Sequence, residues 1–143
     1  MAMIELTPGY SVSPQIALED VQAAADAGIT LVICNRPDAE VPPELSHRAM
    51  EEAARAAGMA FVYIPVTNES LTLEQVTQQA ELLAKADGPV LAYCRSGTRC
   101  SIVWAMGKAG EMPVDEILAT TAKAGYQLEG IRPTLETLAA QKG

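Results

Sequence analysis

Residues 88–100 read GPVLAYCRSGTRC. The apolar run at 89–94 is typical of a short buried strand, and helical spacing is predicted to begin at about residue 99. Between them, Gly97 permits a tight, left-handed turn and a close approach of the backbone. A strand that runs through a tight loop into a helix is the repeating unit of an α/β fold.

The same alternation extends outward over the rest of the chain. The expected strands are residues 3–6 and 10–13 around a turn at 7–9, then 29–35, 60–66 and 89–94. The expected helices are about 17–27, 44–57, 72–86, 99–109, 114–124 and 129–141. Gly28 and Gly58 lie where helices end, and Thr72 with Gln75 forms a predicted capping box. This pattern predicts an α/β fold with a mostly parallel central sheet flanked by helices on both faces.

Length and composition indicate one globular domain over residues 1–143, with 49% hydrophobic and 20% charged residues. The formal net charge of −8 argues against nonspecific binding of nucleic acid. The start, MAMIELTPGY, lacks the features of a signal peptide, and apolar runs such as ITLVIC are too short to span a bilayer. We therefore expect a cytoplasmic protein without membrane contact.

The cysteine and histidine content argues against a disulfide framework and against a metal site. The chain has three cysteines, an odd number that favours free or reactive thiols. It has a single histidine, His47, which we expect on a solvated helix surface, and no C-x-x-C pair. No metal and no cofactor are therefore predicted, and the sequence leaves the oligomeric state open.

The loop after residue 93 has the composition of a reactive cysteine site. Ligands of parallel sheets bind at the carboxyl ends of the strands, where Cys94 is expected. Loop amides and the N-terminus of the next helix would form an anion cradle and lower the pKa of the Cys94 thiol. Arg99 supplies a planar, charged fork for an oxyanion. The expected anion-binding loop comprises Arg95, Ser96, Gly97, Thr98 and Cys100.

A simpler interpretation is a buried strand-end cysteine followed by an ordinary surface turn, since free cysteines are commonly buried as small hydrophobic residues. The order of strand, cysteine, glycine, arginine and helix favours the reactive interpretation. Arg95 is expected either to join the anion site or to point into solvent.

Three stretches carry a resemblance to a known family. AGITLVICNRPDAE (27–40), AAGMAFVYIPV (56–66) and GPVLAYCRSGTR (88–99) together resemble the phosphatase-like domain family found alone or fused to beta-lactamase-like hydrolases. The likeness extends from about residue 14 to 108. It implies a tyrosine/dual-specificity phosphatase-like fold, with Cys94 and Arg99 as catalytic residues and with either phosphatase or sulfur-transfer activity.

The loop distinguishes these two activities. CRSGTR is similar to the active-site loops of both cysteine-dependent phosphatases and rhodanese-type sulfurtransferases. Phosphatases use C-x(5)-R, usually preceded by His and followed by Ser or Thr, whereas this chain has four intervening residues, Tyr93 before the cysteine and Cys100 after the arginine. The shorter ring favours a persulfide on Cys94. We therefore expect a sulfurtransferase, with cysteine-dependent phosphatase as the alternative and a non-catalytic persulfide- or phosphate-sensing module as a third interpretation.

The expected partners follow from that chemistry: a small anionic sulfur donor or a phosphate ester, and a thiol acceptor. A phosphatase also needs a general acid, and the acid candidates are Glu69, which is otherwise a solvated loop residue, and Asp38, which is otherwise a turn residue that orients Arg36. Arg36 either lines the pocket or forms a surface ion pair. Cys34 faces the cleft or belongs to the core, and Cys100 is either a resolving thiol or a packed replacement for serine.

Overall fold

The computed structural model describes residues 3–67 and 69–142. The strands are β1 (Ile4–Thr7), β2 (Tyr10–Ser13), β3 (Leu31–Cys34), β4 (Ala60–Tyr63) and β5 (Val90–Tyr93). The α-helices are α1 (Leu18–Asp26), α2 (His47–Ala56), α3 (Leu73–Lys85), α4 (Thr98–Lys108), α5 (Val114–Lys123) and α6 (Arg132–Lys142). Short 3-10 helices are η1 (Asp38–Glu40), η2 (Pro43–Leu45) and η3 (Glu129–Ile131).

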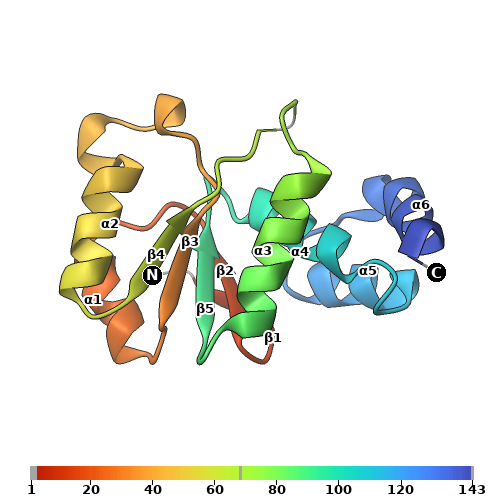
Figure 1. The fold of residues 1–143 in the computed structure, drawn as a ribbon, viewed down its shortest axis with the longest axis horizontal. Coiled ribbons are helices and arrows are strands. Elements are labelled where there is room, and N and C mark those ends of the chain that lie inside the picture. The colour runs from red at the N-terminus through yellow and green to blue at the C-terminus, as the bar shows by residue number, and fades with distance from the viewer. Residues whose placement is uncertain (1–2, 68, 143) are drawn as a thin grey trace.

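The five strands form one sheet in the order β1-β2-β5-β3-β4. β1 pairs antiparallel with β2, and every other pairing is parallel. Figure 1 shows β5 near the middle of the sheet, between β2 and β3. The expected fold class, a mostly parallel sheet flanked by helices, is confirmed.

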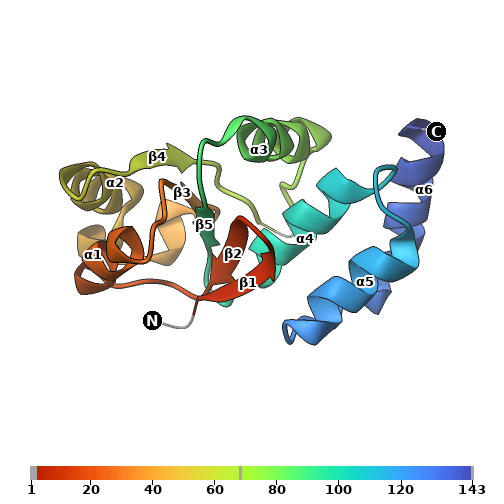
Figure 2. The same ribbon diagram turned by 90° about the horizontal axis from the view of Figure 1, so that it is seen from below.

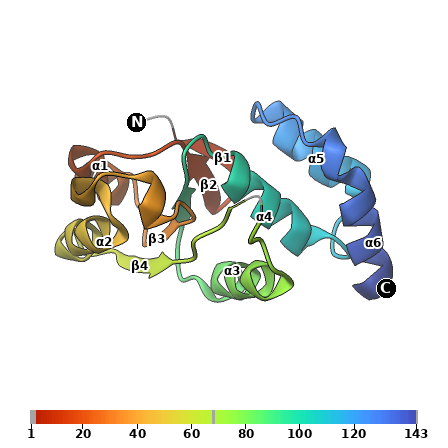
Figure 3. The same ribbon diagram turned by 90° about the horizontal axis from the view of Figure 1, so that it is seen from above.

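The sheet separates two apolar cores. α1 and α2 cover one face, and α3 and α4 cover the other, with α5 and α6 beyond α4 (Figures 2 and 3). Side chains alternate between the two cores along each central strand, because successive residues of a strand point to opposite faces. In β5, Leu91 and Tyr93 face the α1–α2 core, whereas Ala92 and then Cys94 face the α3–α6 core.

The expected boundaries shift at three places. The stretch 60–66 is regular only to Tyr63, because Pro65 has no N–H to donate, although Ile64 N and Val66 N still bond to the β3 segment. The helix predicted over 44–57 divides into η2 and α2, and Ser46 caps α2 through Ala49 N at 3.4 Å. The helix predicted over 129–141 likewise begins as η3 and continues as α6.

The capping box at the start of α3 is confirmed. Gln75 N donates to Thr72 Oγ1 at 3.2 Å, and Thr72 N donates to Gln75 Oε1 at 3.0 Å. These bonds fix the point where α3 begins and so the length of the preceding loop.

The register brings two loops to the same edge of the sheet. Cys34 of β3 lies beside Tyr93 of β5, so the segments that follow both strands begin at the same level. The active-site candidates after β5 therefore meet the turn at η1. No helix in the described part of the chain is both long and apolar enough to cross a membrane.

Candidate active site

The loop after β5 folds around the sulfur of Cys94. Gly97 has φ of 92°, a left-handed conformation that glycine adopts without strain. Its backbone N–H donates to Cys94 Sγ at 3.1 Å. α4 starts at the next residue, so its free N-terminal N–H groups and the positive end of its dipole lie at the same sulfur.

These contacts lower the pKa of the Cys94 thiol to about 5. The largest cause is a hydrogen bond from the Cys100 thiol, and backbone N–H groups of Cys100, Ser96 and Gly97 add to it, while burial acts in the opposite direction. Cys94 is therefore a thiolate at neutral pH, which is the nucleophilic form of cysteine.

Cys100 lies in the first turn of α4 and is completely buried. Burial, followed by the neighbouring Cys94, raises the pKa of the Cys100 thiol well above its usual range. The group thus keeps its proton and serves as a hydrogen-bond donor to Cys94, as a serine or threonine hydroxyl would. A disulfide between the two remains a prediction.

Arg99 is expected to present its fork to a substrate anion, but here a carboxylate of the protein occupies the fork. Its two terminal nitrogens donate to the two oxygens of Glu40, at 2.9 and 2.7 Å, and Nη1 also donates to Val66 O at 2.6 Å. The Arg99 hydrogen bonds are the first cause of the lowered pKa of Glu40. Glu40, which sequence reasoning missed, is therefore a fixed negative charge over the loop.

Arg36 lies on the other side of Glu40. Its Nε is 3.5 Å from Glu40 Oε1, an ion pair too poorly aligned to be a hydrogen bond, and its Nη2 donates to Glu40 O at 3.0 Å. Nη1 donates to Gln15 Oε1 at 3.2 Å. The two interpretations of Arg36 both hold, since it forms an ion pair and lines the same pocket.

A polar pocket of about 750 Å³ opens above the loop. It is lined by Arg36, Glu40, Thr67, Glu69, Arg95, Ser96, Thr98 and Arg99. Cys94 has no exposed surface and lies beneath this lining. A substrate that reaches the sulfur must therefore displace part of the Glu40–Arg99 pair or of the loop.

The acid candidates occupy different environments. Glu69 is exposed and lines the pocket. Asp38 does not line the pocket: its carboxylate accepts from His47 N at 2.8 Å and contacts His47 Nδ1 at 2.6 Å. Burial acts to raise the Asp38 pKa, but the hydrogen bonds from His47 outweigh it and lower that pKa.

Two expectations are therefore wrong. Asp38 does not orient Arg36, because Glu40 at the end of η1 takes that role. His47 is not simply a solvated surface residue, because its ring is stacked on Tyr63 with centroids 3.9 Å apart, and Asp38 holds it there.

Cys34 belongs to the core and does not line the pocket. It is buried at the end of β3, packs among apolar side chains, and donates its S–H to Arg36 O at 3.3 Å. Burial raises the pKa of its thiol. Tyr93, which stands where phosphatases have a histidine, points into the same core, because odd positions of β5 face α1 and α2.

Tyr126 supports the loop from outside. It follows α5, and its hydroxyl donates to Ser96 O at 3.1 Å. A Cβ added to Gly97 would clash with the Tyr126 hydroxyl, so glycine is required there by contact as well as by conformation. No local motif around residue 126 indicates this role.

Arg95 is exposed at the rim, and Ser96 Oγ donates to Thr98 Oγ1 at 3.0 Å. Within residues 3–67 and 69–142, no three His, Cys, Asp or Glu side chains are grouped so that they would hold a metal ion.

Comparison with known proteins gives consistent results. A family model described as the phosphatase-like domain of beta-lactamase hydrolase-like protein matches residues 2–111. The beta-lactamase hydrolase-like protein of Xylella fastidiosa (strain 9a5c) is 30% identical over 143 residues, 99% of this chain and 33% of that protein. The chain thus spans about one third of the length of this curated relative.

Two solved structures show the same architecture. A candidate phosphatase from Neisseria meningitidis is 38% identical with a TM-score of 0.83, covering 96% of this chain and 99% of that one. Tk-PTP in its active form is 14% identical with a TM-score of 0.78, covering 99% of this chain and 98% of that one. At this identity the likeness shows a shared fold and nothing more. These descriptions fit the phosphatase alternative better than the sulfurtransferase that the sequence favours.

The resemblance seen in the sequence is confirmed. The family model covers most of the chain, and the residues it matches include the whole sheet, helices α1–α4 and the Cys94 loop. The chain belongs to the phosphatase-like domain family of the beta-lactamase hydrolase-like proteins.

Proposed function

We propose that the chain is a cysteine-dependent phosphatase in which Cys94 is the nucleophile. The observation that carries the proposal is a buried Cys94 thiol with a pKa of about 5, held by backbone N–H groups at the start of α4. A ring of N–H donors around a thiolate also binds the oxygens of a phosphoryl group. The phosphatase-like family supports this choice of substrate.

The reaction has two steps. The Cys94 thiolate attacks phosphorus, an S–P bond forms as the ester P–O bond breaks, and the leaving oxygen takes its proton from water. Water then attacks phosphorus, the S–P bond breaks, and phosphate leaves with the thiolate restored. Arg99 binds two phosphoryl oxygens once the substrate has displaced Glu40 from its fork.

The carboxyl groups near the pocket limit the range of leaving groups. Glu40 has a lowered pKa and stays charged, so it has no proton to donate, and Asp38 is bound to His47. Glu69 is exposed, and no hydrogen bond to another described residue orients its carboxyl group toward the sulfur. We therefore expect esters with acidic leaving groups, such as aryl phosphates, to react much faster than alkyl phosphates.

Sulfur transfer is the second candidate, and the short loop favours it. Only Arg95, Ser96, Gly97 and Thr98 separate Cys94 from Arg99, which gives a narrower ring than C-x(5)-R. The chemistry needs no acid: Cys94 attacks the outer sulfur of a donor such as thiosulfate, the S–S bond breaks and sulfite leaves. An acceptor thiolate then takes the outer sulfur of the persulfide and releases the Cys94 thiolate.

Intact-mass spectrometry distinguishes the two. The protein is incubated in parallel with an aryl phosphate and with thiosulfate, and turnover is measured as phosphate released and as thiocyanate formed from cyanide. Cys94→Ser should abolish both signals, whereas Cys34→Ala removes a thiol outside the pocket and should leave them. Phosphate release through Cys94 supports the first candidate, and a sulfur adduct without phosphate release supports the second. Absence of both, or activity that survives Cys94→Ser, contradicts both.

A further inference from the structure

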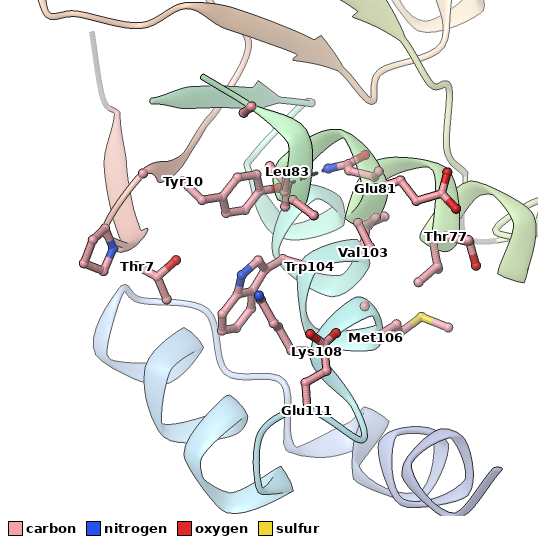
Figure 4. Close-up of a pocket in the computed structure, with 18 of the residues that line it drawn as sticks. Thr7, Tyr10, Thr77, Glu81, Leu83, Val103, Trp104, Met106, Lys108 and Glu111 are labelled. Carbon is pink, nitrogen blue, oxygen red and sulfur yellow. Dashed lines mark hydrogen bonds between the residues drawn. The ribbon is translucent and has the colours of Figure 1, made fainter. Parts of the chain in front are cut away.

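A second pocket lies at the end of the sheet opposite Cys94. Its volume is about 760 Å³, a size typical of small-molecule sites. The β1–β2 turn, the facing sides of α3 and α4, the segment before β5 and the end of α6 enclose it (Figure 4). Neither the Cys94 loop nor any other residue of the candidate active site lines it.

The pocket wall is mainly apolar. The larger apolar side chains that line it are Leu73, Val76, Leu83, Val103, Trp104 and Met106. Leu73, in the first turn of α3, is 55% exposed. An apolar molecule in this pocket would remove such surface from water, which is favourable.

Trp104 lines this wall and carries an unpaired donor, Nε1, which neighbouring atoms cover from solvent. Only 2% of the residue is exposed, yet its Nε1–H has no hydrogen-bond partner among the described residues. A buried N–H without a partner is costly, and such groups are usually paired. An acceptor atom on a bound molecule would satisfy it once the covering side chains shift.

Lys108 adds a positive charge next to that donor. It lies four residues after Trp104 on α4, hence on the same face of the helix, and both line the pocket (Figure 4). Lys108 is half-buried and forms no salt bridge with another described residue. The carboxylates that line the pocket, Glu81, Asp87 and Glu111, are exposed, so water screens their charges more strongly.

We propose that this pocket binds an apolar monocarboxylate, such as a medium-chain fatty acid. The carboxylate pairs with the ammonium group of Lys108 and accepts the Nε1–H of Trp104 once the side chains that cover this atom shift. The hydrocarbon chain lies against the apolar sides of α3 and α4. The donor and the charge together select an anionic head, and the wall selects an apolar body.

Trp104 is the only tryptophan of the chain, so its fluorescence reports binding directly. We would titrate the protein with decanoate below its micelle concentration, and with decanol as a matched uncharged probe. Decanoate should change the Trp104 emission saturably at one molecule per chain and bind about tenfold more tightly than decanol. Equal binding of the two would show that no anion is recognised and would overturn the assignment, as would absence of saturable binding.

Three variants locate the site. Lys108→Met keeps most of the length of the side chain without its charge, and should weaken decanoate binding about tenfold while leaving decanol binding unchanged. Ala80→Leu fills the pocket from α3 and should weaken both probes. Gln78→Leu adds similar bulk at an exposed position of α3 outside the lining and should weaken neither. If Ala80→Leu and Gln78→Leu bind alike, the probe sits elsewhere and the proposal is wrong.

Decanoate binding at the Trp104 pocket does not depend on the proposed phosphatase activity. Inorganic phosphate, which is expected at Arg99, should not compete with decanoate for the Trp104 pocket. Competition between them would place decanoate at the candidate active site and would overturn the second site. Loss of Cys94 chemistry in Cys94→Ser should leave decanoate binding unchanged.

Discussion

Replacing Cys100 by alanine should raise the pKa of Cys94. The Cys100 thiol is the largest single cause of the low value of about 5. A hydrogen bond to a charged group contributes about 1.5–3 kcal/mol, and one pKa unit corresponds to about 1.4 kcal/mol. The midpoint should therefore move from about 5 to roughly 6–7. The backbone N–H groups remain in place, so the value should stay below that of a free cysteine, about 8.5.

The rate of alkylation by iodoacetamide, measured against pH with the modified residue identified by mass, gives this midpoint. The other buried thiols, Cys34 and, in the wild type, Cys100, have raised pKa values and should contribute little below pH 8. Cys100→Ser restores an O–H donor and should return the midpoint close to the wild-type value. An unchanged midpoint in Cys100→Ala, in a variant with a wild-type circular dichroism spectrum, would refute the proposed role of the thiol donor.

The remaining predictions concern the Glu40–Arg99 ion pair, the turn at Gly97 and the pH dependence of stability. Glu40→Gln should release Arg99 and tighten inorganic phosphate binding by roughly fivefold, measured by calorimetry; equal or weaker binding would contradict competition by Glu40. Gly97→Ala should lower the free energy of unfolding by about 1–3 kcal/mol in urea melts, because φ is positive and Tyr126 must move; a neutral effect would show that the turn adapts freely. The Cys94 pKa is about 5 when folded and about 8.5 when unfolded, so the unfolded chain binds more protons between these values. Stability should therefore rise with pH across that window, and Cys94→Ala should remove this share of the rise; identical slopes would contradict the lowered pKa.

The fold class can be predicted from the sequence because the hydrophobic pattern of each segment matches the place that the segment takes in the folded protein. The stretch 88–100 has an apolar strand, an obligatory glycine and a helix, and the structure places each of them within a residue or two of the expected bounds. Boundaries fail where a proline or a cap changes the hydrogen bonding, as at Pro65 and Ser46. Such shifts leave the topology unchanged because the buried faces stay the same.

The environment of the loop is harder to predict, since its main contacts come from distant residues. Glu40 is 59 residues from Arg99 in the chain, and its carboxylate reaches the fork because β3 and β5 are neighbours in register. A single sequence shows that both loops follow strands, but not that these two strands are adjacent. The same reason explains why the stacking of His47 on Tyr63 was missed: the helix pattern shows a polar position without its tertiary partner.

The contact between Tyr126 and Ser96 has a consequence for how such a domain can diverge. Tyr126 follows α5, beyond the residues 2–111 that the family model covers, and the buried Leu135 of α6 packs into the same core as Cys94. The loop itself and the tyrosine that supports it thus lie in separate stretches of the chain. A lineage that altered its last helices would change this support of the loop while Cys94 and Arg99 stayed the same.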